Sequence, residues 1–382
     1  MIKKIGFFVT FFALCSFLSV AQEEHESYQF DTIINLDVTP VKNQAQSGTC
    51  WSFATVSMLE SELLRKTGKH YDLSEMFFVR YAYINRADQY LRRHGNSNFG
   101  PGGQAHDVID VLKSFGCMPE KAYNGLPDDK KIHNHGELDA VLQAYLDVIR
   151  RKRSGSFNTQ WLKGFNALLD AYLGGIPDTF DTEKTTHTPI SYVAALGLNA
   201  DDYIELTSFT HQPFYSNFVL EIPDNWSDGL YFNIPINEMM NAIDHALEHG
   251  YTIAWDGDVS NVGFSFFNGV AVVPENDLFD GMNKEEVNER LAYILPEKMV
   301  TQDYRQEMFD KQVMTDDHLM HLTGMAKDQY GTKYYLIKNS WGTSRNNYGG
   351  YLLMSEQYLR LNTIAVMLNK EGLPKSIGKA IK

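Results

Sequence analysis

Helical hydrophobic patterns occupy the first half of the chain, and strand-like runs occupy its end. The run "SFATVSMLESELLRK" over residues 52–66 spaces its apolar side chains as a helix with one buried face does. The same periodicity predicts helices at 73–93 and 104–116 and a helical pair within 134–182. Residues 317–382 instead alternate β-like runs with turn signals. This order predicts an α+β fold of two packed halves.

The patterns divide the chain into four segments. Residues 1–21 form a leader, 22–125 a helical lobe, 126–235 a helical insertion with a connecting segment, and 236–382 a β-rich lobe. The last segment begins with the amphipathic helix "INEMMNAIDHALEHG" and continues into the strand-like run "YTIAWDGDV". With 382 residues, of which 43% are hydrophobic, the chain can bury a core of this size.

The leader has the pattern of a secretory signal peptide. Lys3 and Lys4 precede an apolar run of about 15 residues that ends in small residues at 19–21. A membrane anchor would need about 20 apolar residues. A lipoprotein would use Cys15, but bulky Leu14 stands before it where a small residue is required. We therefore expect cleavage, export to a periplasm or out of the cell, and no membrane attachment afterwards.

The chain is acidic. Its formal net charge is −14, and loss of the two leader lysines makes the remainder more negative still. Repulsion from phosphate groups opposes binding to nucleic acids and to anionic membranes. Neither is an expected partner.

Two cysteines remain once Cys15 is removed. They are too few for the disulfide framework of an exported protein of this length. Cys50, in "VKNQAQSGTCWSFAT", lies at or just inside a helix N-terminus, where unpaired N–H groups and the helix dipole favour a thiolate. Cys117, in "SFGCMPE", has no comparable setting and is interpreted as structural. Cys50 is thus the candidate nucleophile.

A cysteine nucleophile needs a histidine, a group that orients the histidine, and a donor for the oxyanion. Gln44 precedes Cys50 by six residues on the same loop, so its amide can converge with the Cys50 N–H. His318 begins "HLMHLTG" and Asn339 ends "YYLIKN". A hairpin closed by "KDQYGTK" would bring His318 and Asn339 to the same end of two strands.

Other histidines fit these roles less well. His321 lies three residues beyond His318 on the same strand and therefore points to the opposite face. His245 and His249 are four apart on a helix, but no Glu stands between them in the HExxH order and no third ligand is evident. No metal site and no cofactor are predicted.

Four blocks carry a family resemblance: "PVKNQAQSGTCWSFA", "GPGGQAHDVIDVLKSFG", "DDHLMHLTG" and "IKNSWG" with "YGGYLLM". They resemble, in order, the signature blocks of papain-like cysteine peptidases. The short stretch before the first block, the "GGQ" loop, the helical insertion and "NIPINEMMNAIDHALEHGYTIAWDGDVS" are similar to bleomycin hydrolase and the bacterial cysteine aminopeptidases. The resemblance implies a papain-like fold of two lobes, helical and β-barrel-like, with a helical insertion.

The resemblance also implies a role for each matching residue. Gln44 matches the glutamine that binds the oxyanion, Cys50 the nucleophile, and His318 the general base and acid. Asn339 matches the orienting amide, and Trp341 the tryptophan that shields the His–Asn hydrogen bond.

Two glycines match substrate-binding positions of the family, and two other residues depart from its usual pattern. Gly102 and Gly103 match glycines whose backbone pairs with an extended substrate, where a side chain would block the approach. Ser47 stands where most papain-like enzymes have a disulfide cysteine, as expected for the bleomycin hydrolase branch, and Leu319 replaces the alanine that usually follows the histidine.

The expected function is hydrolysis of peptides by a cysteine aminopeptidase, with peptides as the partners and, by resemblance, a hexameric ring. The family's enzymes end in an arm that restricts them to N-terminal residues, and "GLPKSIGKAIK" stands where that arm is expected to continue. A cysteine endopeptidase is therefore the first alternative. An inactive papain-like binding protein is the second.

Overall fold

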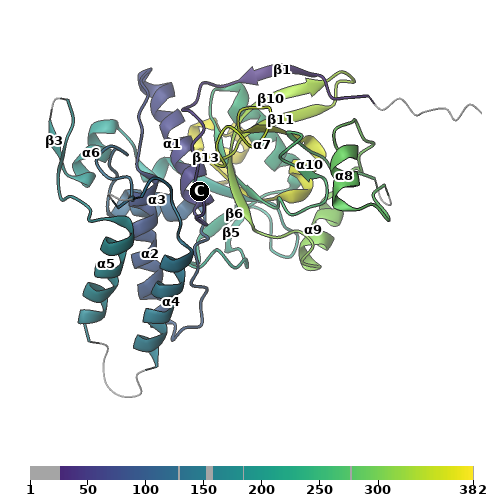
Figure 1. Cartoon of the computed structure of the whole chain (residues 1–382). Coiled ribbons are helices and arrows are strands. Elements are labelled where there is room, and N and C mark those ends of the chain that lie inside the picture. The colour runs from purple at the N-terminus through teal and green to yellow at the C-terminus, as the bar shows by residue number, and fades with distance from the viewer. Residues whose placement is uncertain (1–25, 128–129, 152–157, 184, 276–277, 382) are drawn as a thin grey trace, which may run out of the picture.

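The computed structural model describes residues 26–381 except 128–129, 152–157, 184 and 276–277. A helical lobe stands beside a lobe built on one large mixed sheet (Figure 1). This arrangement confirms the predicted α+β class. The predicted signal peptide lies outside the described residues, and the division into four segments stays a prediction. None of the described helices is long and apolar enough to cross a membrane.

The helical lobe is built around α1 (Cys50–Thr67), which ends at Gly68 in the left-handed conformation, with φ 67°. Almost every residue of α1 up to Leu63 is buried, because the helix packs between the other helices and the sheet. The predicted helices that follow are all present: α2 (Glu75–Arg92), α3 (Ala105–Ser114), α4 (Gly136–Arg150) and α5 (Gln160–Leu173). In Figure 1, α4 and α5 extend away from the sheet as a pair.

The strands of the main sheet come from distant parts of the chain. Their order is β5 (Ser216–Val219), β6 (Leu230–Asn233), β4 (Tyr203–Thr207), β13 (Thr363–Asn369), β7 (Ile253–Gly257), β10 (His318–Asp328), β11 (Lys333–Lys338), β12 (Tyr351–Ser355), β9 (Val270–Ala271) and β8 (Phe264–Ser265). In addition, β1 (Phe30–Asn35) pairs with β10. Two pairings are parallel, β4 with β6 and β12 with β9. The hairpin β10–β11 is the one expected from "KDQYGTK".

Three strands of the main sheet lie in the segment assigned to the insertion and connection. The strands β4, β5 and β6 extend the sheet beyond β13, so residues 203–233 contribute to the β-rich lobe. Their short length and the loops between them weaken the alternating pattern by which strands are recognised.

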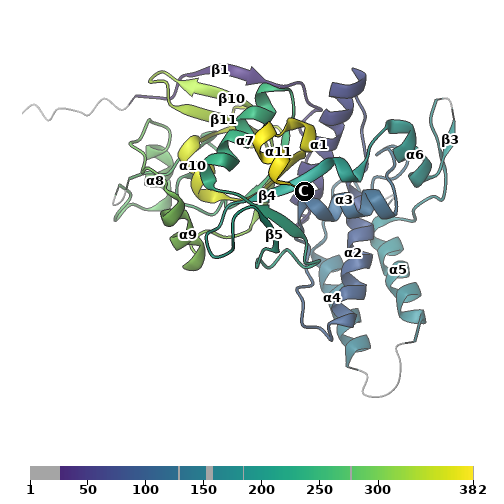
Figure 2. The ribbon, with the colours of Figure 1, turned by 180° about the vertical axis from the view of Figure 1, so that it is seen from behind.

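The remaining elements surround this framework. They are α6 (Pro189–Leu196), α7 (Ile236–Glu248), α8 (Lys284–Arg290), α9 (Gln302–Asp310), α10 (Glu356–Asn362), α11 (Lys375–Ala380), the hairpin β2 (Phe180–Asp181) with β3 (Thr186–His187), and two short 3₁₀ helices, η1 (Ala200–Asp202) and η2 (Lys370–Gly372). Seen from behind, α11 lies beside α7 (Figure 2), and Ile377 of α11 belongs to the same apolar core as Ile243 of α7.

A segment before α1 ties the two lobes together. The N–H of Gln44 donates to Ser340 O at 2.8 Å, and the N–H of Gly342 donates to Lys42 O at 3.1 Å. The loop that leads into Cys50 is therefore bonded to the residues that follow β11.

Candidate active site

Cys50 is the first residue of α1, and its side chain is 9% exposed. The backbone N–H of Leu319, the residue after His318, hydrogen-bonds to the thiol, which places the sulfur beside β10. Burial raises the pKa of Cys50 to about 12, with a further contribution from neighbouring carboxylates. In this conformation burial thus outweighs the helix N-terminus, which was expected to favour a thiolate.

His318 and Asn339 lie together at one end of the β10–β11 hairpin. The distance between His318 Nε2 and Asn339 Oδ1 is 2.9 Å, and the N–H of Ser340 donates to the same oxygen at 2.7 Å. Because a backbone N–H only donates, that atom of Asn339 is the oxygen, and His318 Nε2 must carry the proton. Burial lowers the pKa of His318 to about 4, against the hydrogen bond to Asn339. The neutral imidazole therefore presents an unprotonated Nδ1.

Trp341 covers this pair. Its ring stacks on the His318 imidazole with centroids 4.8 Å apart and an interplanar angle of 29°. Phe264 and Phe266 meet Trp341 edge-on. This stacking is compatible with the shielding role expected of Trp341, which stays a prediction.

Gln44 is held by both neighbouring loops. Its Nε2 donates to Ser47 O at 2.8 Å, and its Oε1 accepts from the Ser340 hydroxyl at 2.6 Å. An amide nitrogen carries two N–H groups, so one remains beyond the bond to Ser47. The hydroxyl of Ser47 donates to Gln44 O and lies 2.6 Å from the Thr49 hydroxyl, so it takes part in the loop's own bonding.

The glycine loop, residues 100–103, lies against the charged side chains of Arg86 and Asp224, a contact that the sequence patterns did not reveal. The guanidinium of buried Arg86 donates to the carbonyl oxygens of Gly100 and Gly102. A Cβ on Gly102 would overlap the Asp224 carboxylate, and one on Gly103 would crowd the Trp51 ring. A larger residue at either position would therefore force neighbouring side chains to shift.

Comparisons with known proteins place the chain in a family. Residues 27–131 match the profile of the papain family cysteine proteases, and residues 178–382, more than half of the chain, match that of the peptidase C1-like family. The chain belongs to the peptidase C1-like family. The resemblance inferred from the four sequence blocks is thereby confirmed.

Curated relatives of this C1-like chain cover most of its length. It is 23% identical to aminopeptidase W and 24% identical to aminopeptidase G of Lactobacillus delbrueckii subsp. lactis, over 91% and 88% of this chain and 85% and 82% of those proteins. It is 19% identical to the mitochondrial cysteine proteinase 1 of Saccharomyces cerevisiae, over 93% of this chain and 80% of that protein. The C1-like chain is therefore a papain-type cysteine peptidase whose relatives bear aminopeptidase names.

A solved structure shares the fold. The crystal structure of pepW from Lactobacillus rhamnosis HN001 superposes with a TM-score of 0.72 at 19% identity, over 92% of this chain and 84% of that one. This likeness confirms the expected papain-like fold.

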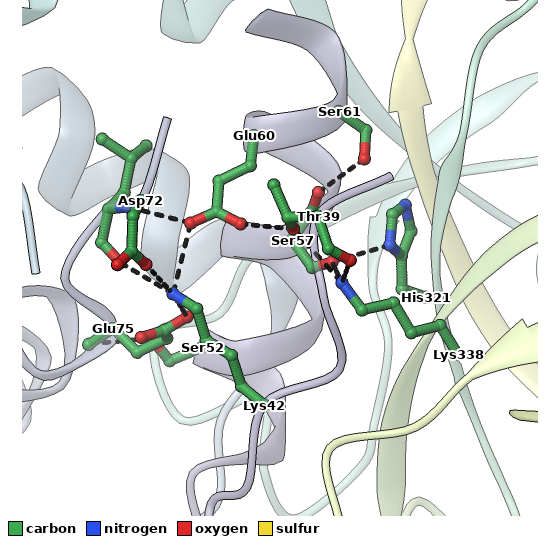
Figure 3. A network of polar contacts seen from close by, with 11 residues as sticks. Thr39, Lys42, Ser52, Ser57, Glu60, Ser61, Asp72, Glu75, His321 and Lys338 are labelled. Carbon is green, nitrogen blue, oxygen red and sulfur yellow. Dashed lines mark hydrogen bonds and ion pairs between the residues drawn. The ribbon is translucent and has the colours of Figure 1, made fainter. Parts of the chain in front are cut away.

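A buried polar network in the C1-like chain joins α1 to the hairpin β10–β11 (Figure 3). Lys338 donates to Thr39 O at 2.6 Å and to the Ser57 hydroxyl at 2.7 Å. The Ser57 hydroxyl, which accepts from Lys338, also lies at hydrogen-bonding distance from His321 Nδ1, 2.8 Å away. His321 therefore belongs to this network and has a different partner from His318, in agreement with its predicted opposite face.

The same network binds the N-terminal segment to α1. Lys42 is ion-paired with Glu60 at 3.3 Å and with Glu75 at 2.7 Å, and the Thr39 hydroxyl donates to Glu60 at 2.6 Å (Figure 3). Buried charges of opposite sign must be paired in this way to be tolerated. The network thus fixes the loop that carries Gln44 relative to α1, which begins at Cys50.

The remaining candidates have structural contacts. His245 Nδ1 lies 2.8 Å from Gly372 O, and the rings of His245 and His249 are stacked with centroids 3.9 Å apart. Within the described part of the chain, no group of three or more His, Cys, Asp or Glu side chains is arranged to hold a metal ion. Cys50 and Cys117 are both free thiols.

Proposed function

We propose that this cysteine peptidase uses Cys50 as its nucleophile, His318 as its general base and acid and Asn339 as the orienting amide, and that it acts as an aminopeptidase. The observation that supports the assignment best is the hydrogen bond between His318 and Asn339. The residue after His318, Leu319, donates its backbone N–H to the Cys50 thiol. These two contacts support a common site for the side chains at positions 50, 318 and 339.

The reaction begins from a neutral thiol and a neutral imidazole. His318 Nδ1 takes the thiol proton as the Cys50 sulfur bonds to the peptide carbonyl carbon. The Cys50 N–H and the second N–H of Gln44 donate to the resulting oxyanion. His318 then passes its proton to the leaving amine as the C–N bond breaks. Water hydrolyses the thioester, with His318 accepting a proton from water and returning one to the sulfur.

Aminopeptidase action is proposed from the relatives and is tested with blocked and free substrates. Aminopeptidases W and G carry that activity in their names and match most of this chain. We expect rapid hydrolysis of amino-acid amides with a free amine and slow hydrolysis of their N-acetylated forms. Rapid cleavage of blocked peptides would identify an endopeptidase instead.

The chemistry is tested separately with the two cysteines. Cys50→Ala should abolish hydrolysis and labelling by a thiol-directed epoxide, while the matched Cys117→Ala should keep both, because Cys117 lies in the apolar core. Hydrolysis that persists in Cys50→Ala would exclude the mechanism. A wild-type protein that binds peptides without cleaving them would be the inactive binding protein.

Export and assembly are further proposals. We propose that the leader directs export and that the mature chain forms a homo-oligomer, a hexamer by resemblance to the bleomycin hydrolase branch. N-terminal sequencing of the protein from its native host would show whether the leader is removed. Light scattering after size-exclusion chromatography would give the assembled mass, and a monomer would contradict the hexamer.

A further inference from the structure

Three carboxylates from separate segments gather near Cys50. Asp224 lies on the loop between β5 and β6, Asp256 is in β7, and Asp316 lies two residues before β10. The charge of each acts on the Cys50 thiol, and on the neighbouring strand Asp256 lies opposite Leu319, whose N–H bonds to that thiol. Gln104, at the end of the glycine loop, donates through Nε2 to Asp316 at 3.1 Å.

Asp256 is buried without a partner for either carboxylate oxygen. Its side chain is 3% exposed, and neither oxygen accepts a hydrogen bond. It faces Asp316 within hydrogen-bonding reach, and burial together with that neighbour raises the pKa of Asp256 well above its usual range. Two carboxylates can bond to each other only through a shared proton, so a cation is the alternative occupant.

Other buried polar atoms beside these carboxylates are also unused. Gln104 Oε1 and the Tyr231 hydroxyl have no hydrogen-bond partner, and both side chains are fully buried. The charges of Asp256 and Asp316 act on the Tyr231 hydroxyl, so it too faces this group of side chains. Buried polar atoms of this kind normally find hydrogen-bond partners.

The cations nearby are already committed. Arg86 donates to the carbonyl oxygens of Gly100 and Gly102. His106 is 2.7 Å from Glu205, and the negative charge of that partner raises the pKa of His106 against its burial. Neither group bonds to Asp256 or Asp316, and the raised pKa values of these two carboxyl groups show that a shared proton or a bound cation would relieve their mutual repulsion.

The loop that carries Asp224 is fixed in place. Asn98 Nδ2 donates to Pro223 O at 3.1 Å and to Asp224 Oδ1 at 3.0 Å. Trp226 Nε1 donates to Asp107 Oδ2 at 2.9 Å. Asp224 and Asp316 are half-buried, whereas Asp256 is buried. The two more exposed carboxylates are therefore the ones that a ligand would contact first.

We propose that Asp224, Asp256 and Asp316 bind the α-ammonium group of the substrate peptide and thereby select its N-terminal residue. An ammonium group supplies one positive charge and three N–H donors, which matches a site rich in carboxylate oxygens. Among the described residues, these three carboxylates are not arranged to hold a metal ion. This inference rests on the proposed peptidase function and adds to it the residues that recognise the amine.

The first test compares free and N-acetylated fluorogenic alanine amides in the full chain. We expect Asp256→Asn and Asp224→Asn to lower the ratio of kcat/KM for the free amine to that for the acetylated amide by about tenfold or more, chiefly through KM. Glu297→Gln is the matched control, because burial also raises the pKa of Glu297, to about 7, at a site away from Cys50. It should leave the ratio unchanged.

The second test needs no catalysis. In Cys50→Ala, calorimetry should show binding of alanyl-alanine that is weakened by acetylation and by adding Asp256→Asn. An unchanged substrate ratio in folded Asp variants, or equal binding of both dipeptides, would overturn the proposal and leave a shared proton as the role of Asp256. Preference for acetylated lysine over acetylated norleucine amides would overturn it in favour of a side-chain ammonium. Failure of the peptidase function would appear separately, as wild-type protein that cleaves neither amide.

Discussion

His318 Nε2 and Asn339 Oδ1 are 2.9 Å apart, and the N–H of Ser340 holds the same oxygen from the other side. The hairpin β10–β11 sets this distance, since it brings the start of one strand next to the residue after the other. One tautomer of His318 follows from the bond. That tautomer leaves Nδ1 as the nitrogen able to exchange a proton with Cys50.

Removal of the imidazole should cost more than removal of the amide that orients it. His318→Ala loses the proton transfer itself, and we expect kcat to fall by about 10²–10⁴-fold. Asn339→Ala keeps the imidazole but no longer fixes the tautomer and the orientation of the ring, so the fall in kcat should be smaller. Steady-state kinetics on one substrate checks the order. An Asn339→Ala enzyme with wild-type kcat would show that the hydrogen bond has no role in catalysis.

Gln44 is expected to act on the transition state as well as to join two loops. Gln44→Ala removes the oxyanion donor, and we expect kcat to fall by about 10²–10³-fold with little change in KM. Ser340→Ala is the matched control, because it removes only the hydroxyl that bonds to Gln44 Oε1. Equal losses in the two variants would mean that Gln44 contributes only through loop position.

The sequence patterns predicted the helices and hairpins that form within continuous segments. They missed the groups of side chains that form where distant segments meet. The helix that begins near Cys50 and the hairpin of His318 and Asn339 follow from local periodicity and turn residues. The grouping of Asp224, Asp256 and Asp316 could not be predicted, because it depends on how a loop, a central strand and a strand entry meet. The neutral Cys50 and His318 were missed for a related reason, since burial is a property of the packed fold.

Activity on a blocked substrate should persist in acid. Burial lowers the pKa of His318 from 6.5 to about 4, so the imidazole stays neutral until the pH falls to about that value. We expect kcat/KM for an acetylated amide to decline only near pH 4, with circular dichroism as the check on folding. A decline centred near pH 6.5 would contradict a buried, neutral His318.

Free-amine substrates should show an additional dependence on pH. Burial, with the charge of Asp224, raises the pKa of Asp316 to about 7, and Asp256 is also raised. Because the ionised carboxylates bind ammonium, the ratio of kcat/KM for the free amine to that for the acetylated amide should rise as the pH passes through about 7. A ratio that stays constant from about pH 5 to about pH 8 would argue against these groups as the amine site.

Lys338 is expected to be important for stability. It is buried and donates to Thr39 O and to the Ser57 hydroxyl. Lys338→Ala leaves these acceptors unpaired, so the free energy of unfolding should fall by about 1–3 kcal/mol. Urea denaturation measures it. Exposed Lys370, which donates to Asp201 O, is the control, and its alanine variant should change stability by about 0.5 kcal/mol or less.

The role of Cys50 is tested by the hydrolysis rate of a free-amine fluorogenic alanine amide by wild type, Cys50→Ala and Cys117→Ala, each first shown to be folded. We expect turnover by wild type and Cys117→Ala, none by Cys50→Ala, and a single epoxide adduct on Cys50 by mass spectrometry. Turnover by Cys50→Ala equal to that of wild type would contradict this role.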